Sequence, residues 1–225
     1  MSDILREVDE ELRHERYRKL WDRYGLYVVG AAVLLVLAVA GWRGWEWYAA
    51  RQASESSVRF EAAMQLSREG KRAEAEAAFN TLAKEGTAGY RTLSRFRAAA
   101  EAGKADAKAG VAAFDAIAAD GSLDAAMRDI ARVQAAYLLL DTASVAEIKS
   151  RMDPLAAPGG AFRHSANEII GLAHYRAGEY EQAAKIFASI VTDPETPPSL
   201  RQRAQIVNAL VAGAAPAKPA APATQ

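Results

Sequence analysis

The chain has few residues that could do chemistry. It contains three histidines and no cysteine, which excludes thiolate metal sites, cysteine catalysis and a disulfide scaffold. His164 and His174 are ten positions apart on one expected helix, whereas a helical zinc pair needs histidines four apart. A histidine on a helix is more often packed against its neighbours than bound to a metal, and His14 lies in a charged stretch. We therefore expect packing or surface histidines rather than metal ligands.

Other catalytic motifs are also missing from the sequence. No nucleophile elbow, phosphate-binding loop or dinucleotide-binding glycine pattern occurs, and the carboxylates are scattered as on a solvated face. Basic and acidic residues number 28 each, so the net charge of zero gives no electrostatic footprint for nucleic acid. We predict no enzyme, cofactor, metal, small-molecule substrate or nucleic-acid partner. Function must then come from how the elements of the chain are placed.

One such element is the stretch 24–42, YGLYVVGAAVLLVLAVAGW, which contains no charged residue. As a helix its 19 residues would span about 28 Å, close to the hydrocarbon thickness of a bilayer. Tryptophan and tyrosine, which prefer the headgroup level, flank it on both sides. We therefore predict a single membrane-spanning helix. The anchor residues are Tyr24, Val33, Leu34, Leu35, Val36, Leu37, Trp42, Arg43 and Trp45.

Lysine and arginine are distributed unequally around this stretch, and only Arg43 and Arg51 follow it closely. The positive-inside rule then puts the N-terminus in the cytoplasm and the long C-terminal part in the periplasm or outside the cell. Over a similar distance before the stretch lie five basic residues, Arg13, Arg16, Arg18, Lys19 and Arg23.

Two alternative interpretations of the stretch remain open. Ala38-Val39-Ala40 fits a signal-peptide cleavage site, although the region before it is long and acidic where a short basic region is expected. A buried core helix is the other alternative, although such helices are usually shorter and more polar.

From residue 52 to 211, helix-forming segments alternate with short turns. Alanine is abundant and no alternating strand pattern is present. Asp153-Pro154 is expected to end a helix, because the residue before proline avoids the α region. Helices are predicted at about 53–69, 71–85, 90–102, 105–119, 123–140, 143–151, 162–177, 179–192 and 197–211.

The helices pair in a recurring pattern. In the last pair, Gly171 and Ala183 are small where two helices would cross, Phe187 fills the groove beside them and Gly178 makes the turn. This pattern resembles the tetratricopeptide repeat, a helix–turn–helix unit. A third unit near 123–152 is poor and retains Ile148. Two earlier units have the pattern at Ala63, Gly70, Ala75, Phe79 and Leu82, and at Ala98, Gly110, Phe114 and Ile117.

The sequence thus predicts an all-α protein: a single N-terminal transmembrane helix plus an α-solenoid of degenerate tetratricopeptide-like helical hairpins. A generic helical bundle is the alternative. The charged cytoplasmic segment 1–23 is either an amphipathic helix or a solvated, partly helical tail. The other predicted segments are the transmembrane helix 24–42, a juxtamembrane helix 43–57 continuing into the repeats, a periplasmic repeat domain 58–211 and a disordered Ala/Pro-rich tail 212–225.

Several local sequences resemble the YfgM-like family of membrane-anchored bacterial proteins. They are the junction 41–45 (GWRGW) and the segments 90–93, 131–134, 193–197 and 206–210. The resemblance covers nearly the whole chain except its charged start and its tail, and rests on the order of elements. It implies a bacterial inner-membrane protein with a periplasmic domain, an ancillary subunit of the SecYEG translocon, and contact with a PpiD-type periplasmic chaperone.

Stacked helical hairpins present an extended concave surface suited to peptides or helices. The repeat register predicts that Thr92, Arg95, Ser165, Glu168 and Tyr175 face it; the alternative is that they are ordinary surface residues. We therefore expect a scaffold or adaptor that links the translocon to chaperones. The alternative function is an interaction protein in cell-envelope assembly or division without translocon contact.

Overall fold

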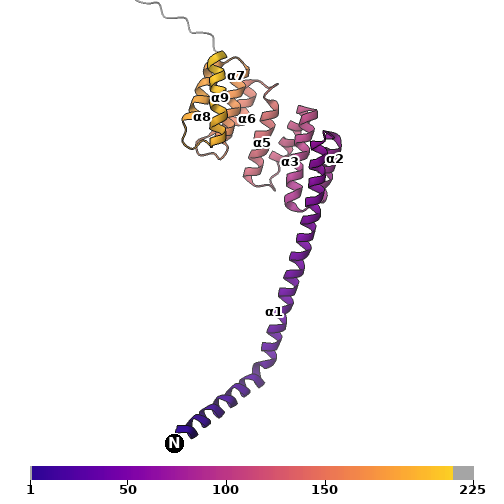
Figure 1. The fold of residues 1–225 in the computed structure, drawn as a ribbon, viewed down its shortest axis with the longest axis vertical. Coiled ribbons are helices and arrows are strands. Elements are labelled where there is room, and N and C mark those ends of the chain that lie inside the picture. The colour runs from indigo at the N-terminus through magenta and orange to yellow at the C-terminus, as the bar shows by residue number, and fades with distance from the viewer. Residues whose placement is uncertain (1, 215–225) are drawn as a thin grey trace, which may run out of the picture. The chain divides into compact units, whose positions relative to one another are not determined.

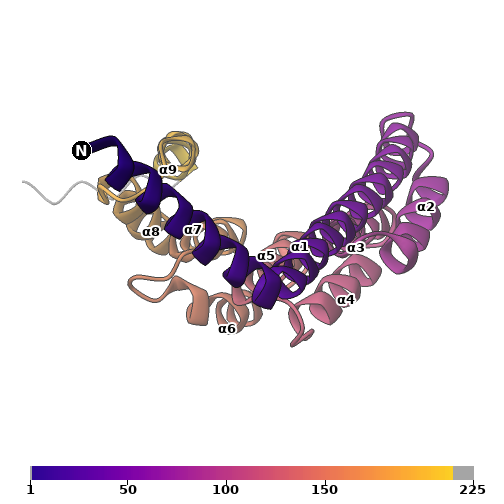
Figure 2. The same cartoon turned by 90° about the horizontal axis from the view of Figure 1, so that it is seen from below.

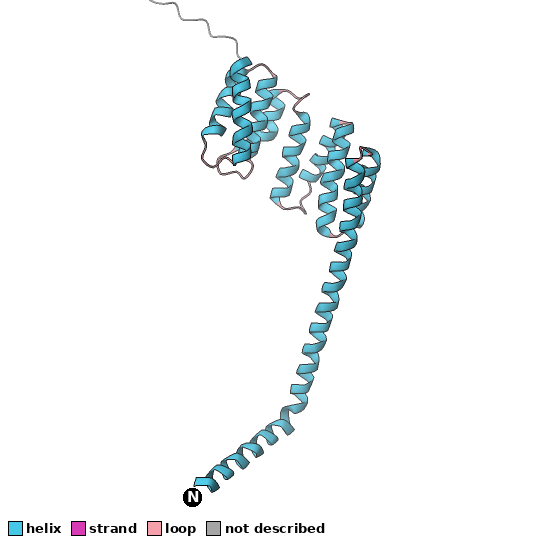
Figure 3. Cartoon of the chain, in the orientation of Figure 1, coloured by secondary structure: helices cyan, strands magenta, loops and turns pink. Residues whose placement is uncertain are grey.

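Every regular element that the structure describes is an α-helix, as predicted (Figure 1, Figure 3). The structure is a computed structural model that describes residues 2–214, with side chains for residue 18 and residues 21–214. The helices are α1 (Ser2–Arg68), α2 (Arg72–Glu85), α3 (Ala88–Ala105), α4 (Ala107–Ala118), α5 (Ala125–Leu139), α6 (Val145–Ala156), α7 (Arg163–Arg176), α8 (Tyr180–Thr192) and α9 (Pro198–Ala214).

The chain divides after Glu55 into two units, each described here by itself. The first unit is the N-terminal part of α1, and the backbone of residues 2–23 is helical. Helix α1 continues without a break to Arg68, so residues 43–57 are helical, and their assignment as a juxtamembrane segment stays a prediction.

The second unit is a series of helical hairpins. The end of α1 pairs with α2, α3 with α4, α5 with α6 and α7 with α8, and α9 packs on α8. Seen from below, α3, α5 and α7 lie in one row and α4 and α6 in a second row (Figure 2). We call α3, α5, α7 and α9 the odd row. This two-row stack is the arrangement expected of an α-solenoid.

The residues of the predicted repeat pattern form the core of each hairpin. Four apolar clusters follow the hairpins in chain order, and each joins the two helices of a pair to the next helix. The repeat interpretation is therefore confirmed at these positions. The buried side chains of the pattern belong to Ala63, Ala75, Phe79, Leu82, Ala98, Phe114, Ile117, Ile148, Ala183 and Phe187.

Glycines stand where the backbone needs them. Gly70 and Gly178 both have φ of 76°, a left-handed conformation that glycine adopts without strain, and each follows the first helix of its hairpin. A Cβ on Gly171 would lie 2.9 Å from Cε2 of Phe187, so α7 and α8 cross closely there. A Cβ on Gly110 would lie 2.4 Å from Cα of Gly103, and α3 and α4 therefore meet at two glycines.

Two predicted boundaries were wrong. Helix α6 does not end before Pro154 but continues to Ala156. Leu155 is buried with Met152 in the apolar cluster of α5, α6 and α7, and burial of a leucine side chain stabilises the fold by about 1.5–3 kcal/mol. A proline in the last turn of a helix removes only one helical hydrogen bond. Helix α9 extends to Ala214, so residues 212–214 are helical; the rest of the predicted tail, 215–225, lies outside the described residues.

Candidate functional site

All residues of the apolar stretch of α1 except Gly25 are exposed. The predicted apolar anchor residues from Tyr24 to Trp45 have between 49 % and 72 % of their surface exposed. From Trp21 on, the helix is long and apolar enough to cross a membrane, and only 6 % of its most apolar window is buried. This contradicts the core-helix alternative, because such a helix would be mostly buried. The stretch is a candidate membrane anchor, and cleavage after Ala40 remains the alternative.

Aromatic rings surround α1 at the C-terminal end of this stretch. With about 3.6 residues per turn, the exposed rings of Trp42, Trp45, Trp47 and Tyr48 point to different sides of the helix. Arg51 lies over the ring of Trp47, 5.8 Å from its centroid. Such rings suit a headgroup layer around the whole helix, whereas a helix lying on a surface would gather them on one face.

The second unit contains an apolar groove between α3 and α5. Its volume is about 400 Å³. Leu93 has half of its surface exposed, so the groove is open to solvent. The side chain of Asp124 accepts a hydrogen bond from the backbone N–H of Met127 at 2.7 Å and starts α5 at the groove. The lining residues are Leu93, Phe96, Arg97 and Ala100 of α3, Phe114 of α4, and Met127, Ile130 and Gln134 of α5.

An ion pair ties α3 to the loop before α5. Arg95 Nη1 donates to Asp120 Oδ2 at 2.6 Å. The hydroxyl and the backbone N–H of Ser122 donate to the other oxygen of Asp120, at 2.6 and 3.0 Å. Hydrogen bonds from Ser122, and then from Arg95, lower the pKa of Asp120 to about 2. The Asp120 carboxylate thus joins Arg95 of α3 to Ser122 in the loop before α5.

A second polar cluster joins the rest of the odd row. Glu168 of α7 is 4 % exposed and accepts from the hydroxyl of Tyr137 on α5 at 3.0 Å. Arg203 of α9 donates to the same carboxylate through Nε at 2.9 Å and Nη2 at 2.8 Å. Burial, and then the Glu168 carboxylate, raises the pKa of Tyr137 to about 12. We call Tyr137, Glu168 and Arg203 the triad; it links α5, α7 and α9.

The triad makes the titration of Tyr137 depend on Glu168. We expect Glu168→Gln to lower the pKa of Tyr137 from about 12, because the carboxylate that raises it is removed. A raised pKa favours the neutral phenol in the folded state, so the stability from Tyr137 is complete below pH ~10 and disappears between pH ~10 and about 12. Tyrosinate absorbance against pH, with Tyr137→Phe identifying the signal, measures the shift. An unchanged pKa would contradict the role of Glu168.

Three of the predicted groove residues make side-chain contacts within the domain. Arg95 is held by Asp120, Glu168 is buried in the triad, and Tyr175 packs on Tyr180 with ring centroids 5.7 Å apart. These contacts lie within the domain, and a binding role for these three residues stays a prediction.

The two remaining predicted residues are half-buried. The hydroxyl of Thr92 donates to the carbonyl of Ala88 at 3.3 Å, and Ser165 lies on α7. A binding role for Thr92 and Ser165 stays a prediction.

The groove itself was missed because its residues fit a core pattern equally well. On α3 the groove begins at Leu93, one residue after Thr92, and this step turns the face of a helix by about 100°. The available signal was an apolar stripe on two successive odd helices, at 93, 96 and 100 and at 127 and 130. A single neighbouring helix cannot cover the stripes of both α3 and α5, so part of this apolar surface stays open.

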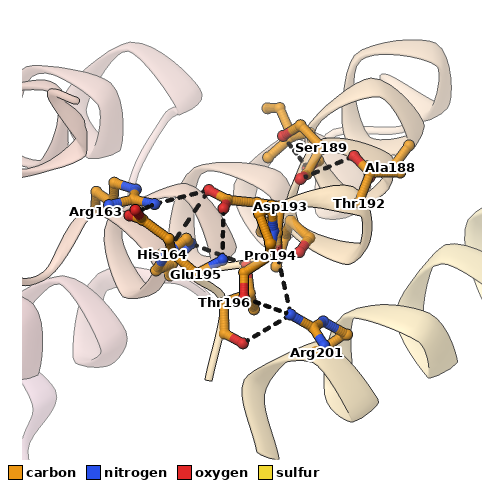
Figure 4. Close-up of polar contacts among 12 residues, drawn as sticks. Arg163, His164, Ala188, Ser189, Thr192, Asp193, Pro194, Glu195, Thr196 and Arg201 are labelled. Atoms are coloured by element: carbon orange, nitrogen blue, oxygen red, sulfur yellow. Dashed lines mark hydrogen bonds and ion pairs between the residues drawn. The ribbon is translucent and has the colours of Figure 1, made fainter. Parts of the chain in front are cut away.

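The loop between α8 and α9 is closed by arginines from both sides (Figure 4). Arg163 Nη2 donates to Asp193 Oδ2 at 2.9 Å and to Glu195 Oε2 at 2.7 Å. Arg201 Nη2 donates to three carbonyls, of Asp193, Pro194 and Thr196, at 3.0–3.1 Å. The hydrogen bond from Arg163 is the main reason that the pKa of Asp193 is lowered. Segment 193–197 is therefore a loop that hydrogen bonds from Arg163 of α7 and Arg201 of α9 hold in place.

The histidines with described side chains take part in packing. Nδ1 of His164 lies 3.2 Å from the hydroxyl of Thr196, and Nδ1 of His174 lies 2.5 Å from Glu179 Oε2. Among the residues that the structure describes, no group of three or more His, Asp or Glu side chains could hold a metal ion.

A comparison with known families agrees with the hairpins. Residues 18–201 match the model of a family described as a tetratricopeptide repeat-like domain. No curated protein and no solved structure is significantly similar to the chain. Repeat domains of this kind are typically interaction modules without catalysis. The match covers well over half of the chain, which therefore belongs to the tetratricopeptide repeat-like domain family.

Proposed function

We propose that the chain is a membrane-anchored scaffold that holds other proteins on the odd row of its repeat domain. The open apolar groove between α3 and α5 carries this proposal. Its lining includes Leu93, which has half of its surface exposed. Apolar surface of this kind on a repeat domain marks a binding site for a peptide or a helix.

The proposed topology has a cytoplasmic N-terminus and a periplasmic repeat domain at the bacterial inner membrane. It is supported by the excess of lysine and arginine before residue 24 and by the resemblance to the YfgM-like family. The exposed apolar helix would serve as the tether, and the groove would do the binding.

The proposed partners are the SecYEG translocon and a PpiD-type periplasmic chaperone, supported by the family resemblance alone. The second candidate is a role in cell-envelope assembly or division without translocon contact. Both roles use the same anchor and groove, so the identity of the bound protein separates them.

Photo-crosslinking in intact membranes tests this proposal. We expect a crosslinking amino acid at Leu93, in the groove, to capture subunits of the translocon or the chaperone. The same amino acid at Lys108, an exposed position on α4, serves as the matched control and should capture neither. Recovery of cell-envelope or division proteins from Leu93 would favour the second role. Equal capture from both positions would contradict a role for the groove.

A further inference from the structure

In the part of the chain that the structure describes, hydrogen bonds join the helices of the odd row to one another, except between α3 and α5. The triad joins α5, α7 and α9 by hydrogen bonds of 2.8–3.0 Å. Among the described residues, no hydrogen bond or ion pair joins α3 directly to α5; apolar side chains line the space between them. An open apolar groove in an otherwise bridged row calls for an occupant from outside the domain.

The walls of the groove have the spacing of helix-packing surfaces. On α3 the lining residues recur at positions 93, 96, 97 and 100, and on α5 at 127, 130 and 134. Phe114 is 3 % exposed and forms the floor, with its ring centroid 6.1 Å from that of Phe96. Two facing stripes with this period form a groove into which the ridge of a third helix fits.

The charge of Arg97 at the rim of the groove indicates which kind of helix can bind there. Arg97 is the one charged residue among those that line the groove, and it forms no hydrogen bond or ion pair with any residue that the structure describes. By contrast, Arg95 and Lys104 on the same helix are paired with carboxylates at 2.6 and 2.7 Å. Helix α3 carries four basic residues and one acidic residue. The rim therefore has an unmatched positive charge beside an apolar surface.

We propose that the groove binds an amphipathic helix of a partner protein that carries carboxylates beside its apolar stripe. The apolar residues of that helix enter between Leu93 and Ile130, and a carboxylate pairs with Arg97. This inference rests on the proposed function, in that it takes the odd row as the protein-binding face, and it adds the chemistry of the ligand.

Two synthetic helices test the inference on the full chain in lipid nanodiscs. The first has leucines at i, i+3, i+4 and i+7 flanked by glutamates; its twin has lysines in place of the glutamates. Measured by fluorescence anisotropy, the glutamate peptide should bind about tenfold more tightly than the lysine peptide. Arg97→Glu should reverse this preference, and Leu93→Ser should weaken both peptides.

Matched variants separate the groove from the rest of the surface. Lys108→Glu changes an exposed charge on α4, and Val58→Ser changes an apolar residue on α1 that is 68 % exposed. Neither should alter binding of the peptides, and circular dichroism should show all variants folded. Equal or tighter binding of the lysine peptide, no binding of either peptide, or no effect of Leu93→Ser would overturn the inference. Self-association that Leu93→Ser abolishes would instead assign the groove to a second copy of the chain.

The proposed function and this inference can fail separately. If partners crosslink to Leu93 in membranes equally well in the Arg97→Glu variant, the scaffold role stands and the acidic helix is wrong. If the glutamate peptide binds as expected but no partner crosslinks to Leu93, the chemistry of the groove stands and the scaffold role is wrong.

Discussion

Replacing Leu34 and Leu35 with arginine is expected to release the protein from the membrane fraction. Both residues lie near the middle of the apolar stretch and are more than 60 % exposed. An arginine at the centre of a spanning helix costs about 2.5–3.5 kcal/mol, and each lost leucine removes a further ~0.3–0.6 kcal/mol. The double substitution therefore costs roughly 6–8 kcal/mol of insertion free energy.

Carbonate extraction followed by centrifugation measures this effect. The wild-type chain and a Leu34→Ile, Leu35→Ile variant should stay in the pellet. A double arginine substitution at Ile206 and Leu210, which are exposed on α9, should also stay there, because these residues lie outside the stretch. A wild-type chain extracted by carbonate, or a Leu34→Arg, Leu35→Arg chain that resists it, would show that the stretch is not the anchor.

Replacing Phe187 with alanine is expected to lower the free energy of unfolding of the repeat domain by about 3–5 kcal/mol. Phe187 is fully buried between α7, α8 and α9, in the cluster that includes Leu200 and Ala204. Its ring also fills the space over Gly171. Removing the ring leaves a cavity that these helices can close only in part, which adds to the lost burial. Urea unfolding of the full chain, followed by circular dichroism, measures the change.

A double-mutant cycle with Gly171 makes this prediction specific. Gly171→Ala alone should destabilise, because its Cβ would lie 2.9–3.0 Å from two ring atoms of Phe187. In the Phe187→Ala background the ring is gone, so the same substitution should cost little or restore some stability. Additive effects of the two substitutions would contradict direct packing of Phe187 on Gly171.

The sequence predicted the features that depend on local chemistry. The turn glycines Gly70 and Gly178 stand at positive φ, where a side chain would be strained, so their positions mark the hairpins. Small residues such as Ala75 and Ala183 recur where helices cross, and both are fully buried. The apolar stretch of α1 is equally local, since only its length and lack of charge define it.

The sequence did not predict the features that depend on contacts between distant residues. Glu168 looked like a surface carboxylate, but its partners Tyr137 and Arg203 are 31 and 35 positions away. Pro154 looked like a helix end, but the burial of Leu155 keeps α6 helical. The groove could be predicted only by knowing that α5 faces α3. Thr92 and Leu93 lie on different faces of α3, so an error of one residue selects the wrong face.

Cysteine labelling tests the central proposal most directly, namely that one helix tethers a repeat domain on the far side of the membrane. The chain has no cysteine, so Ser2→Cys and Ser199→Cys each give a single thiol, one on either side of the apolar stretch. In spheroplasts, a membrane-impermeant maleimide should label Ser199→Cys at once and Ser2→Cys only after lysis. Labelling of both variants, of neither, or of Ser2→Cys alone in intact spheroplasts would contradict the proposal.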